Sequence, residues 1–252
     1  MNRAFLQERR PLLTVMMQCR EPETIIARVR NGLALGAEAF GLQVESLNPE
    51  FKTEEIFKKL FSEMRGKPCY VTNYRTGSNR GKSDEALGEE LLALASYSHL
   101  LCDVMGDLYC PHPEELTEDP VAIEKQMKLI DQIHEMGSEV LMSSHILKFT
   151  PAERVLEVAL EQKRRGADII KIVTGADSME QQIENLRITN LLKEELGAPF
   201  LFLSGGECSI HRRLGMKLGC CMALCVYEHD DLSTDTQPLL QTMKTIRDGI
   251  DF

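Results

Sequence analysis

The stretch that decides the fold runs from residue 152 to residue 175 and reads "AERVLEVALEQKRRGADIIKIVTG". Its first part carries apolar residues three and four positions apart, which is the spacing of an amphipathic helix. Gly166 follows this pattern directly, in the position where a glycine commonly ends a helix. The run "DIIKIVT" (168–174) then has the length and the β-branched content of a buried strand. The stretch therefore predicts one helix followed by one strand.

The same alternation runs along the whole chain. Other amphipathic stretches are "EEIFKKLFSEM" (54–64) and "AIEKQMKLIDQIHEMG" (122–137), and the second also ends at a glycine, Gly137. The strand-like runs are "LLTVMMQ" (12–18), "AFGLQV" (39–44), "CYVTNY" (69–74), "HLLCDVM" (99–105), "EVLMSSH" (139–145), "DIIKIVT" (168–174), "PFLFLSG" (199–205) and "CCMALCV" (220–226). Eight strand–helix units without a Pro-, Gly- or Ser-rich linker predict an α/β protein, a single (β/α)8 barrel domain spanning residues 1–252. A doubly wound open sheet is the alternative.

Composition excludes several classes of partner. The chain has 29 Lys and Arg against 39 Asp and Glu, a formal net charge of −10, so no large basic surface for nucleic acid is expected. Its eight cysteines lie mostly in apolar runs, and the N-terminal "MNRAFLQERR" has no apolar signal core. Free cysteines in a reducing compartment fit this better than disulfides, so we expect a cytoplasmic protein. The longest apolar run, "CCMALCVY", is too short to span a membrane.

The sequence shows no strong cofactor or metal signal. Neither a dinucleotide fingerprint nor a P-loop occurs, and "LSGGE" (203–207) can be read as an anion cradle or, more simply, as a turn. Cys208, His211 and the later cysteines lack a paired CxxC spacing. We therefore predict neither a cofactor nor a metal.

Lys171 lies in the middle of the apolar run 168–174, where an ionised lysine is costly to bury without a partner. Desolvation disfavours the ammonium form and makes a neutral amine available as a nucleophile. Such an amine attacks a ketone to give an imine, which acidifies the neighbouring C–H bond and calls for a base such as His145. The alternative is a lysine that reaches the barrel rim or pairs with a buried acid such as Asp103.

In a barrel, side chains at the carboxyl ends of the strands meet at one mouth, so they form a single list of candidates. Read in chain order, these candidates are Gln43, Glu45, Arg75, Asn79, Asp103, His145, Lys171, Arg212, Arg213, Ser233 and Gln237.

Three stretches, "EVLMSSHILKFTPA", "RRGADIIKIV" and "SIHRRLG", resemble segments of the type I 3-dehydroquinate dehydratases, Schiff-base (β/α)8 enzymes of the shikimate pathway. The resemblance covers essentially the full chain. It implies that His145 is the general acid/base, that Lys171 forms the imine, and that Arg212, with Arg213 as its neighbour, binds the substrate carboxylate. Four further residues match family positions: Arg75, Ser233 and Gln237, which are expected to contact substrate, and Asp103, which matches an aspartate of strand four.

The chain also departs from the family pattern. The family has a glutamate and an arginine where this chain has Gln43 and Glu45, so the charge at the second position is reversed. The family glutamate that orients the histidine corresponds to Asn79 in "RTGSNRG". An amide can hydrogen-bond an imidazole but stabilises its cation less than a carboxylate does, which predicts weakened or altered proton transfer by His145.

The resemblance implies a carbon–oxygen lyase that converts 3-dehydroquinate to 3-dehydroshikimate and water, a step of aromatic amino acid biosynthesis. The expected partner is a small cyclic keto-carboxylate, and a homodimer is left open. Two alternatives stay open: a related Schiff-base lyase or aldolase acting on another hydroxy-keto acid, and a non-catalytic binding protein that kept the barrel.

Overall fold

The computed structural model describes residues 4–7 and 11–250. The strands are β1 (Leu12–Met17), β2 (Ala39–Gln43), β3 (Cys69–Thr72), β4 (Leu101–Met105), β5 (Glu139–His145), β6 (Ile169–Gly175), β7 (Phe200–Gly205) and β8 (Met222–Cys225). The α-helices are α1 (Pro22–Leu35), α2 (Glu54–Glu63), α3 (Asp84–Tyr97), α4 (Pro120–Glu135), α5 (Ala152–Arg164), α6 (Met179–Leu191), α7 (His211–Leu218) and α8 (Leu240–Gly249). Short helical turns are η1 (Phe5–Gln7), η2 (Val44–Ser46), η3 (Pro49–Phe51), η4 (Gly77–Asn79) and η5 (Leu192–Leu196).

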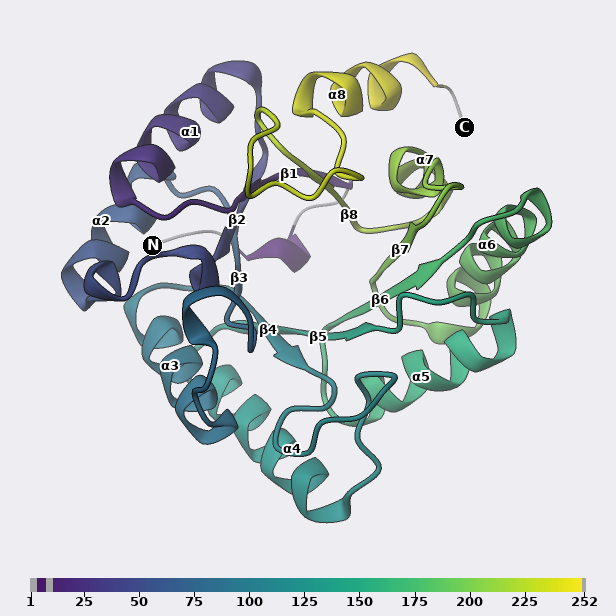
Figure 1. Ribbon diagram of the computed structural model, residues 1–252, viewed down its shortest axis with the longest axis horizontal. Coiled ribbons are helices and arrows are strands. Elements are labelled where there is room, and N and C mark those ends of the chain that lie inside the picture. The colour runs from purple at the N-terminus through teal and green to yellow at the C-terminus, as the bar shows by residue number, and fades with distance from the viewer. Residues whose placement is uncertain (1–3, 8–10, 251–252) are drawn as a thin grey trace.

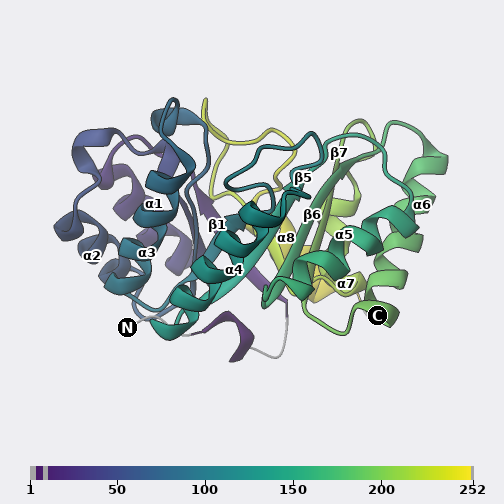
Figure 2. The same cartoon turned by 90° about the horizontal axis from the view of Figure 1, so that it is seen from below.

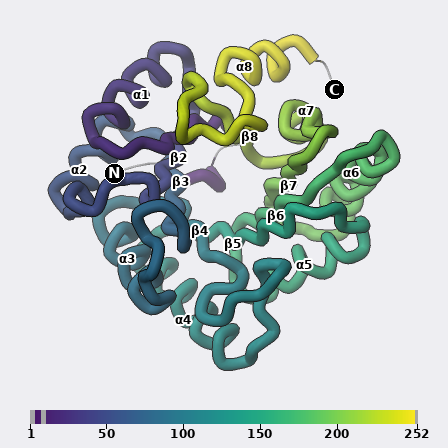
Figure 3. Tube along the Cα trace, in the orientation of Figure 1, coloured from purple at the N-terminus to yellow at the C-terminus, as the bar shows by residue number. Residues whose placement is uncertain are grey.

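The strands form one parallel sheet in the order β7-β6-β5-β4-β3-β2-β1-β8, so each strand lies beside its neighbour in the chain and the last pairs with the first. The ring comes together between β7 and β8, where the Cys221 amide donates to the Phe200 carbonyl oxygen at 2.9 Å. Figure 1 shows the helices outside the ring of strands, and Figure 3 shows the chain passing from β7 to β8 around it. The predicted (β/α)8 barrel is confirmed, and the doubly wound alternative is wrong.

The predicted strands agree closely with the observed ones. The prediction for β5, residues 139–145, is the strand itself, and the other seven differ by one or two residues at one end or at both. All eight strands are almost entirely buried, because one face packs under the helices and the other fills the barrel. This explains why they read as continuous apolar runs rather than as alternating ones.

Local chemistry sets the ends of the helices. The side chains of Thr53, Ser83, Asp119 and Ser178 each accept a hydrogen bond from the backbone of the first turn of α2, α3, α4 and α6. The predicted stops at Gly137 and Gly166 are confirmed, since both take the left-handed conformation, with φ of 80° and 102°.

The two ends of the barrel differ. At the amino end of the strands, the Phe5 and Leu6 amides of η1 donate to the Glu139 carboxylate at 2.7 and 3.0 Å. The loops that follow the strands gather at the opposite end, and Figure 2 shows η1, in dark purple, on the far side from them. Polar residues at the carboxyl ends of the strands therefore share one mouth. Within the described residues, no helix is long and apolar enough to cross a membrane.

Candidate active site

Lys171 lies inside the barrel on β6 and is held by three groups. Its Nζ donates to the hydroxyls of Tyr70 at 2.9 Å and Tyr74 at 2.7 Å, and it lies 3.2 Å from Asp103 Oδ2. The lysine side chain is 5% exposed and the Asp103 side chain 0%. The pairing with Asp103 that the sequence left open is therefore present. A buried ion pair often adds little to stability, so stability alone does not explain why Lys171 and Asp103 are buried together.

Asp103 is the acceptor for three hydroxyls besides the lysine. Tyr70 and Tyr74 both donate to Oδ2, and Ser143 donates to Oδ1 at 2.6 Å. Burial, and then the negative charge of Asp103, raise the pKa of both phenols well above their usual value. At neutral pH the two tyrosines are therefore protonated and act as donors toward this carboxylate.

A cavity of about 180 Å³ opens above Lys171. The residues that line it are Met16, Gln43, Tyr70, Tyr74, His145, Leu147, Lys171, Val173, Leu203, Arg212, Leu224, Thr234 and Gln237. A second cavity, of about 410 Å³, adjoins it and shares Tyr74, His145 and Leu147. Five of the residues predicted from the sequence thus border one space: Gln43, His145, Lys171, Arg212 and Gln237.

His145, the last residue of β5, is held by Glu115. The imidazole Nδ1 lies 2.7 Å from Glu115 Oε2, and the His145 backbone amide donates to the same oxygen at 2.8 Å. Burial alone would raise the pKa of Glu115, but the hydrogen bond and charge of His145 bring it below its usual value. A carboxylate on Nδ1 fixes the orientation of the imidazole ring.

The loop between β4 and α4 holds Glu115 in place. The Glu115 backbone has a φ of 46°, and the Glu115 carbonyl accepts a hydrogen bond from the Ser144 hydroxyl at 2.7 Å. A Cβ at Gly106 would lie 2.4 Å from that carbonyl oxygen, so only glycine permits this close approach. Beneath the loop, the buried Arg165 donates to the carbonyls of Thr117 at 2.6 Å and Gly106 at 3.0 Å.

Asn79 does not contact His145. Its amide nitrogen donates to Asn73 Oδ1 at 2.7 Å and to the Tyr74 carbonyl at 2.9 Å, and its oxygen accepts from Lys52 Nζ at 2.7 Å. The side chain is fully buried in the loop after β3. The expectation that Asn79 stands beside His145 is thus not met, because Glu115 from the next loop occupies that place.

Glu45 turns away from the cavity. Its carboxylate accepts hydrogen bonds from the Thr72 hydroxyl at 2.9 Å and the Tyr74 amide at 3.4 Å, and burial raises its pKa. Arg75 borders the second cavity, but its guanidinium is engaged by Asp84 at 2.8 Å and Asp107 at 2.7 Å.

The loop between β8 and α8 carries two of the predicted site residues, Ser233 and Gln237, and only Gln237 borders the cavity. Ser233 bonds within its own loop, to Asp230, whereas its neighbour Thr234 borders the first cavity. Gln237 is buried at the same cavity, and its Oε1 has no hydrogen-bond partner among the described residues. Gln237 can therefore accept a hydrogen bond from a ligand in the cavity, whereas the hydrogen bonds of Ser233 hold it within its own loop.

Arg212, at the start of α7, borders the cavity, and its neighbour Arg213 does not. Arg212 Nε donates to the Ser204 carbonyl at 3.0 Å, and no ion pair to it is found among the described residues. Burial lowers the pKa of the guanidinium to about 10, which leaves it cationic at neutral pH. An arginine in this position favours an anion, and above all a carboxylate, in the cavity.

The glycine pair lies where β7 ends and a turn begins, as the simpler interpretation has it. Gly206 has a φ of 80°, and the following Glu207 amide donates to Asp177 Oδ1 at 3.0 Å. A carboxylate of the chain itself therefore takes this amide. All eight cysteines are free thiols, and within residues 4–7 and 11–250 no cluster of His, Cys, Asp and Glu could hold a metal ion.

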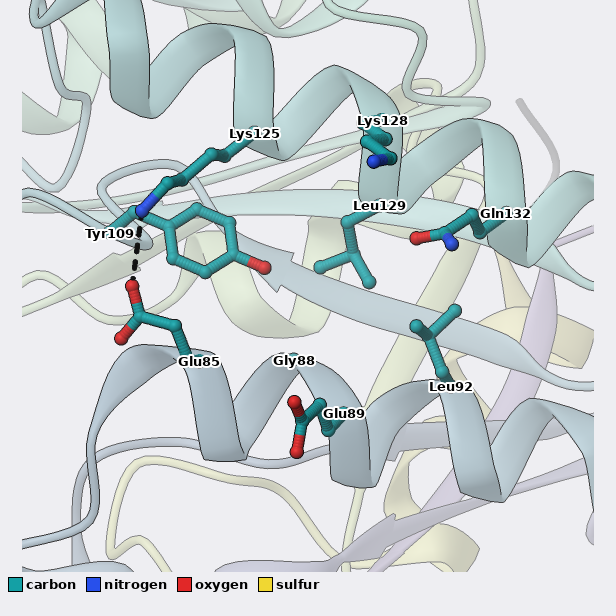
Figure 4. A pocket seen from close by; sticks show the side chains of 9 residues that line it. All are labelled: Glu85, Gly88, Glu89, Leu92, Tyr109, Lys125, Lys128, Leu129 and Gln132. Atoms are coloured by element: carbon teal, nitrogen blue, oxygen red, sulfur yellow. Dashed lines mark hydrogen bonds and ion pairs between the residues drawn. The ribbon is translucent and has the colours of Figure 1, made fainter.

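A groove of about 310 Å³ also lies on the outside of the barrel, between α3 and α4. Figure 4 shows Lys125 extended across the Tyr109 ring toward Glu85, with an Nζ–Oε1 distance of 3.2 Å. Both charged side chains are more than half exposed, and none of the predicted site residues lines the groove.

Comparison with known proteins shows the family to which the chain belongs. The profile of the type I 3-dehydroquinases matches residues 13–250. The chain belongs to the type I 3-dehydroquinase family. The resemblance noted in the sequence is thereby confirmed.

The relatives of this chain are distant. A 3-dehydroquinate dehydratase of Syntrophotalea carbinolica is 30% identical over 159 residues, 60% of this chain and 58% of the relative. One of Alkaliphilus oremlandii is 34% identical over 95 residues, 37% of this chain and 36% of the relative. The aligned stretches thus span less than two thirds of these curated relatives.

Solved structures agree in fold. The type I 3-dehydroquinate dehydratase of Clostridium difficile has a TM-score of 0.79 at 16% identity, with 96% of this chain and 92% of that chain covered. The 3-dehydroquinate dehydratase of Geobacillus kaustophilus has a TM-score of 0.80 at 15% identity, with 94% and 90% covered. At 15 to 16% identity these two structures show only that the barrel fold is shared.

Sequence reasoning missed three residues of the site: Tyr70, Tyr74 and Glu115. The two tyrosines are four residues apart in "CYVTNY", and positions two or four apart in a strand share a face, so this signal was available. Glu115 carried no such signal, because it lies in a loop 30 residues before its partner His145.

Proposed function

We propose that this chain is a Schiff-base dehydratase that converts 3-dehydroquinate to 3-dehydroshikimate and water. The observation that carries the proposal is the single cavity bordered by Lys171, His145 and Arg212. Membership of the type I 3-dehydroquinase family supports it, as do the relatives named 3-dehydroquinate dehydratase. The Clostridium difficile structure holds covalently modified comenic acid, which supports covalent chemistry in this fold.

Arg212 binds the substrate carboxylate in this proposal. Its guanidinium borders the cavity without an ion pair among the described residues, so an incoming carboxylate supplies the missing counter-charge. Gln43, Thr234 and Gln237 bind ring hydroxyls, and the unpartnered Gln237 Oε1 accepts one of them.

Lys171 attacks the substrate ketone and forms an imine. The protonated imine withdraws electrons from the adjacent carbon, whose proton His145 removes. The same imidazolium then returns its proton to the hydroxyl that leaves from the next carbon, so a C–O bond breaks and a C=C bond forms. Glu115 stabilises the imidazolium between these two steps, because its carboxylate lies on Nδ1. Water finally releases the product from Lys171.

A second candidate is a Schiff-base lyase or aldolase that acts on another hydroxy-keto acid. It is favoured by one part of the cavity wall, where the side chains of Met16, Leu203 and Leu224 are apolar. The engagement of Arg75 by two aspartates and the turning away of Glu45 point the same way. The acceptance of 3-dehydroquinate in a steady-state assay separates the two candidates.

The imine is tested by borohydride reduction in the presence of 3-dehydroquinate. Only an imine is reduced to a stable secondary amine, so the peptide that contains Lys171 is expected to gain the ligand skeleton irreversibly. Peptide mapping of the unaltered protein gives this result without any variant. Lys171→Met removes the adduct, whereas Lys58→Ala, at an exposed position on α2, retains it. An adduct on a different lysine would overturn the assignment, and no adduct with any keto acid would favour a binding protein.

Other expectations from the sequence stay predictions: a single domain, a cytoplasmic location, a homodimer and no binding to nucleic acid. The eight free cysteines support a reducing compartment. The net charge of −10 supports the absence of nucleic acid as a partner.

A further inference from the structure

Tyr74 stands between the two groups that carry the proposed chemistry. Its hydroxyl accepts from Lys171 Nζ at 2.7 Å and donates to Asp103 Oδ2. Its ring meets the His145 ring edge-on, with centroids 5.4 Å apart. Tyr74 also borders both cavities at the barrel mouth, and its side chain is half-buried. One hydroxyl therefore touches both Lys171 and a carboxylate, in a residue that borders the space where a ketone would bind.

We propose that the Tyr74 hydroxyl is the proton shuttle for formation and hydrolysis of the imine at Lys171. This inference rests on the proposed Schiff-base function and adds a catalytic residue to it. No role for a tyrosine follows from the motifs in the sequence, since the assigned acid/base is His145. His145 serves the proton on carbon, whereas Tyr74 serves the protons that move between nitrogen and oxygen.

The proton balance of imine formation requires such a group. An ammonium and a ketone give a protonated imine and one water, so two of the three ammonium protons must reach the ketone oxygen. Asp103 takes the first from Lys171, and the neutral amine then attacks the carbonyl carbon. As the C–N bond forms, the C=O π pair moves to oxygen, which receives the Tyr74 proton while the new N–H proton returns to the phenolate.

The second half of the step uses the same path. The proton stored on Asp103 passes through the Tyr74 hydroxyl to the carbinolamine hydroxyl, which leaves as water while the nitrogen lone pair forms the C=N bond. Tyr74 ends as it began, and no other reactant is needed. The hydrogen bonds from Lys171 to Tyr74 and from Tyr74 to Asp103 give this path its geometry.

Tyr70 provides a matched control within the same cluster. Its hydroxyl also contacts Lys171, at 2.9 Å, and Asp103, so its removal disturbs the ion pair in a comparable way. Both border the first cavity, but Tyr70 is fully buried on β3, whereas Tyr74 follows the strand, is partly exposed and borders the second cavity as well. Burial and the charge of Asp103 hold the pKa of Tyr74 well above its usual value, so the phenol is protonated as a donor must be.

The test is the rate at which borohydride-trappable imine forms after rapid mixing with 3-dehydroquinate. Tyr74→Phe is expected to slow this rate about 100-fold, in the range typical of general acid/base assistance. Tyr70→Phe is expected to slow it only a few-fold. In Tyr74→Phe, imine formation then limits turnover, so the kinetic isotope effect of substrate deuterated beside the ketone disappears. The affinity for a carboxylate analogue without a ketone should not change.

The possible results distinguish failure of the proposed function from failure of the Tyr74 shuttle. The absence of a Lys171 adduct in the unaltered protein overturns the proposed function itself. A normal adduct there, with trapping by Tyr74→Phe at the unaltered rate, overturns only the shuttle. Equal slowing in Tyr70→Phe and Tyr74→Phe assigns the effect to the ion pair and also overturns it. If Tyr74→Phe does not fold, 3-fluorotyrosine at position 74 decides, since a shuttle with a more acidic phenol must shift the pH profile of trapping.

Discussion

The loops after β3 and β4 lie at the same end of the barrel, but only one of them gives His145 a carboxylate. The β3 loop carries Asn79, which is buried and bonded to its own loop and to Lys52. The β4 loop carries Glu115, whose Oε2 lies 2.7 Å from His145 Nδ1. Figure 1 shows the β4 loop, in teal, at the rim of the barrel between β4 and α4. The carboxylate beside His145 thus comes from the β4 loop, and not from the β3 loop where the resemblance to the family places it.

The two loops also differ in the contacts that hold Asn79 and Glu115 in place. Asn79 acts as a structural tie, since all its side-chain hydrogen-bond partners belong to its own loop or to Lys52. Glu115 is a positioning group fixed from outside, by Ser144 on β5 through its carbonyl and by Arg165 beneath the loop. Replacing the first should therefore affect folding, and replacing the second should affect activity.

The largest effect is expected for Glu115→Gln. An amide keeps the size of the side chain but loses the charge that favours the imidazolium, so kcat should fall roughly 10- to 100-fold, the usual effect of removing a group that orients a functional histidine. Steady-state kinetics with 3-dehydroquinate measure it. The matched control is Glu114→Gln, because the Glu114 carboxylate binds Arg154 and Lys148 instead. Equal kcat values for the two variants would show that the charge of Glu115 does not act through His145.

Asn79→Glu comes next, and its expected effect is on stability. The substitution removes two amide donors, to Asn73 and to the Tyr74 carbonyl, at a cost of about 1 to 2 kcal/mol in the free energy of unfolding. It should not raise kcat, because the position beside His145 is already occupied. Urea denaturation and kinetics on the same sample check both points. A gain in kcat would mean that the β3 loop, and not the β4 loop, governs the histidine.

The smallest effect is that of pH on the Glu115–His145 pair. The pKa of Glu115 is lower in the folded protein than its usual value, so the pair adds stability above that usual value and loses it as the pH falls through the folded pKa. The difference in unfolding free energy between the unaltered protein and Glu115→Gln should shrink in this acidic range. Denaturation at a series of pH values measures it, and a constant difference would show that the carboxylate is not stabilised by His145.

The fold could be predicted from the sequence because its signals are local. Runs such as 139–145 and 168–174 are apolar for the length of one strand, and Gly137 and Gly166 mark helix ends by their backbone freedom. Lys171 could be singled out for a related reason, since a charge inside an apolar strand is visible in the sequence itself.

The tertiary structure alone decided which groups surround the lysine and the histidine. Asp103, Tyr70 and Tyr74 meet Lys171 across 68 to 101 residues of chain, and Glu115 reaches His145 across 30. Such contacts depend on how strands are placed around the ring and how a loop folds back, which no local spacing records. The sequence therefore determined the barrel and singled out Lys171, whereas the source of the carboxylate beside His145 was decided by the path of the β4 loop.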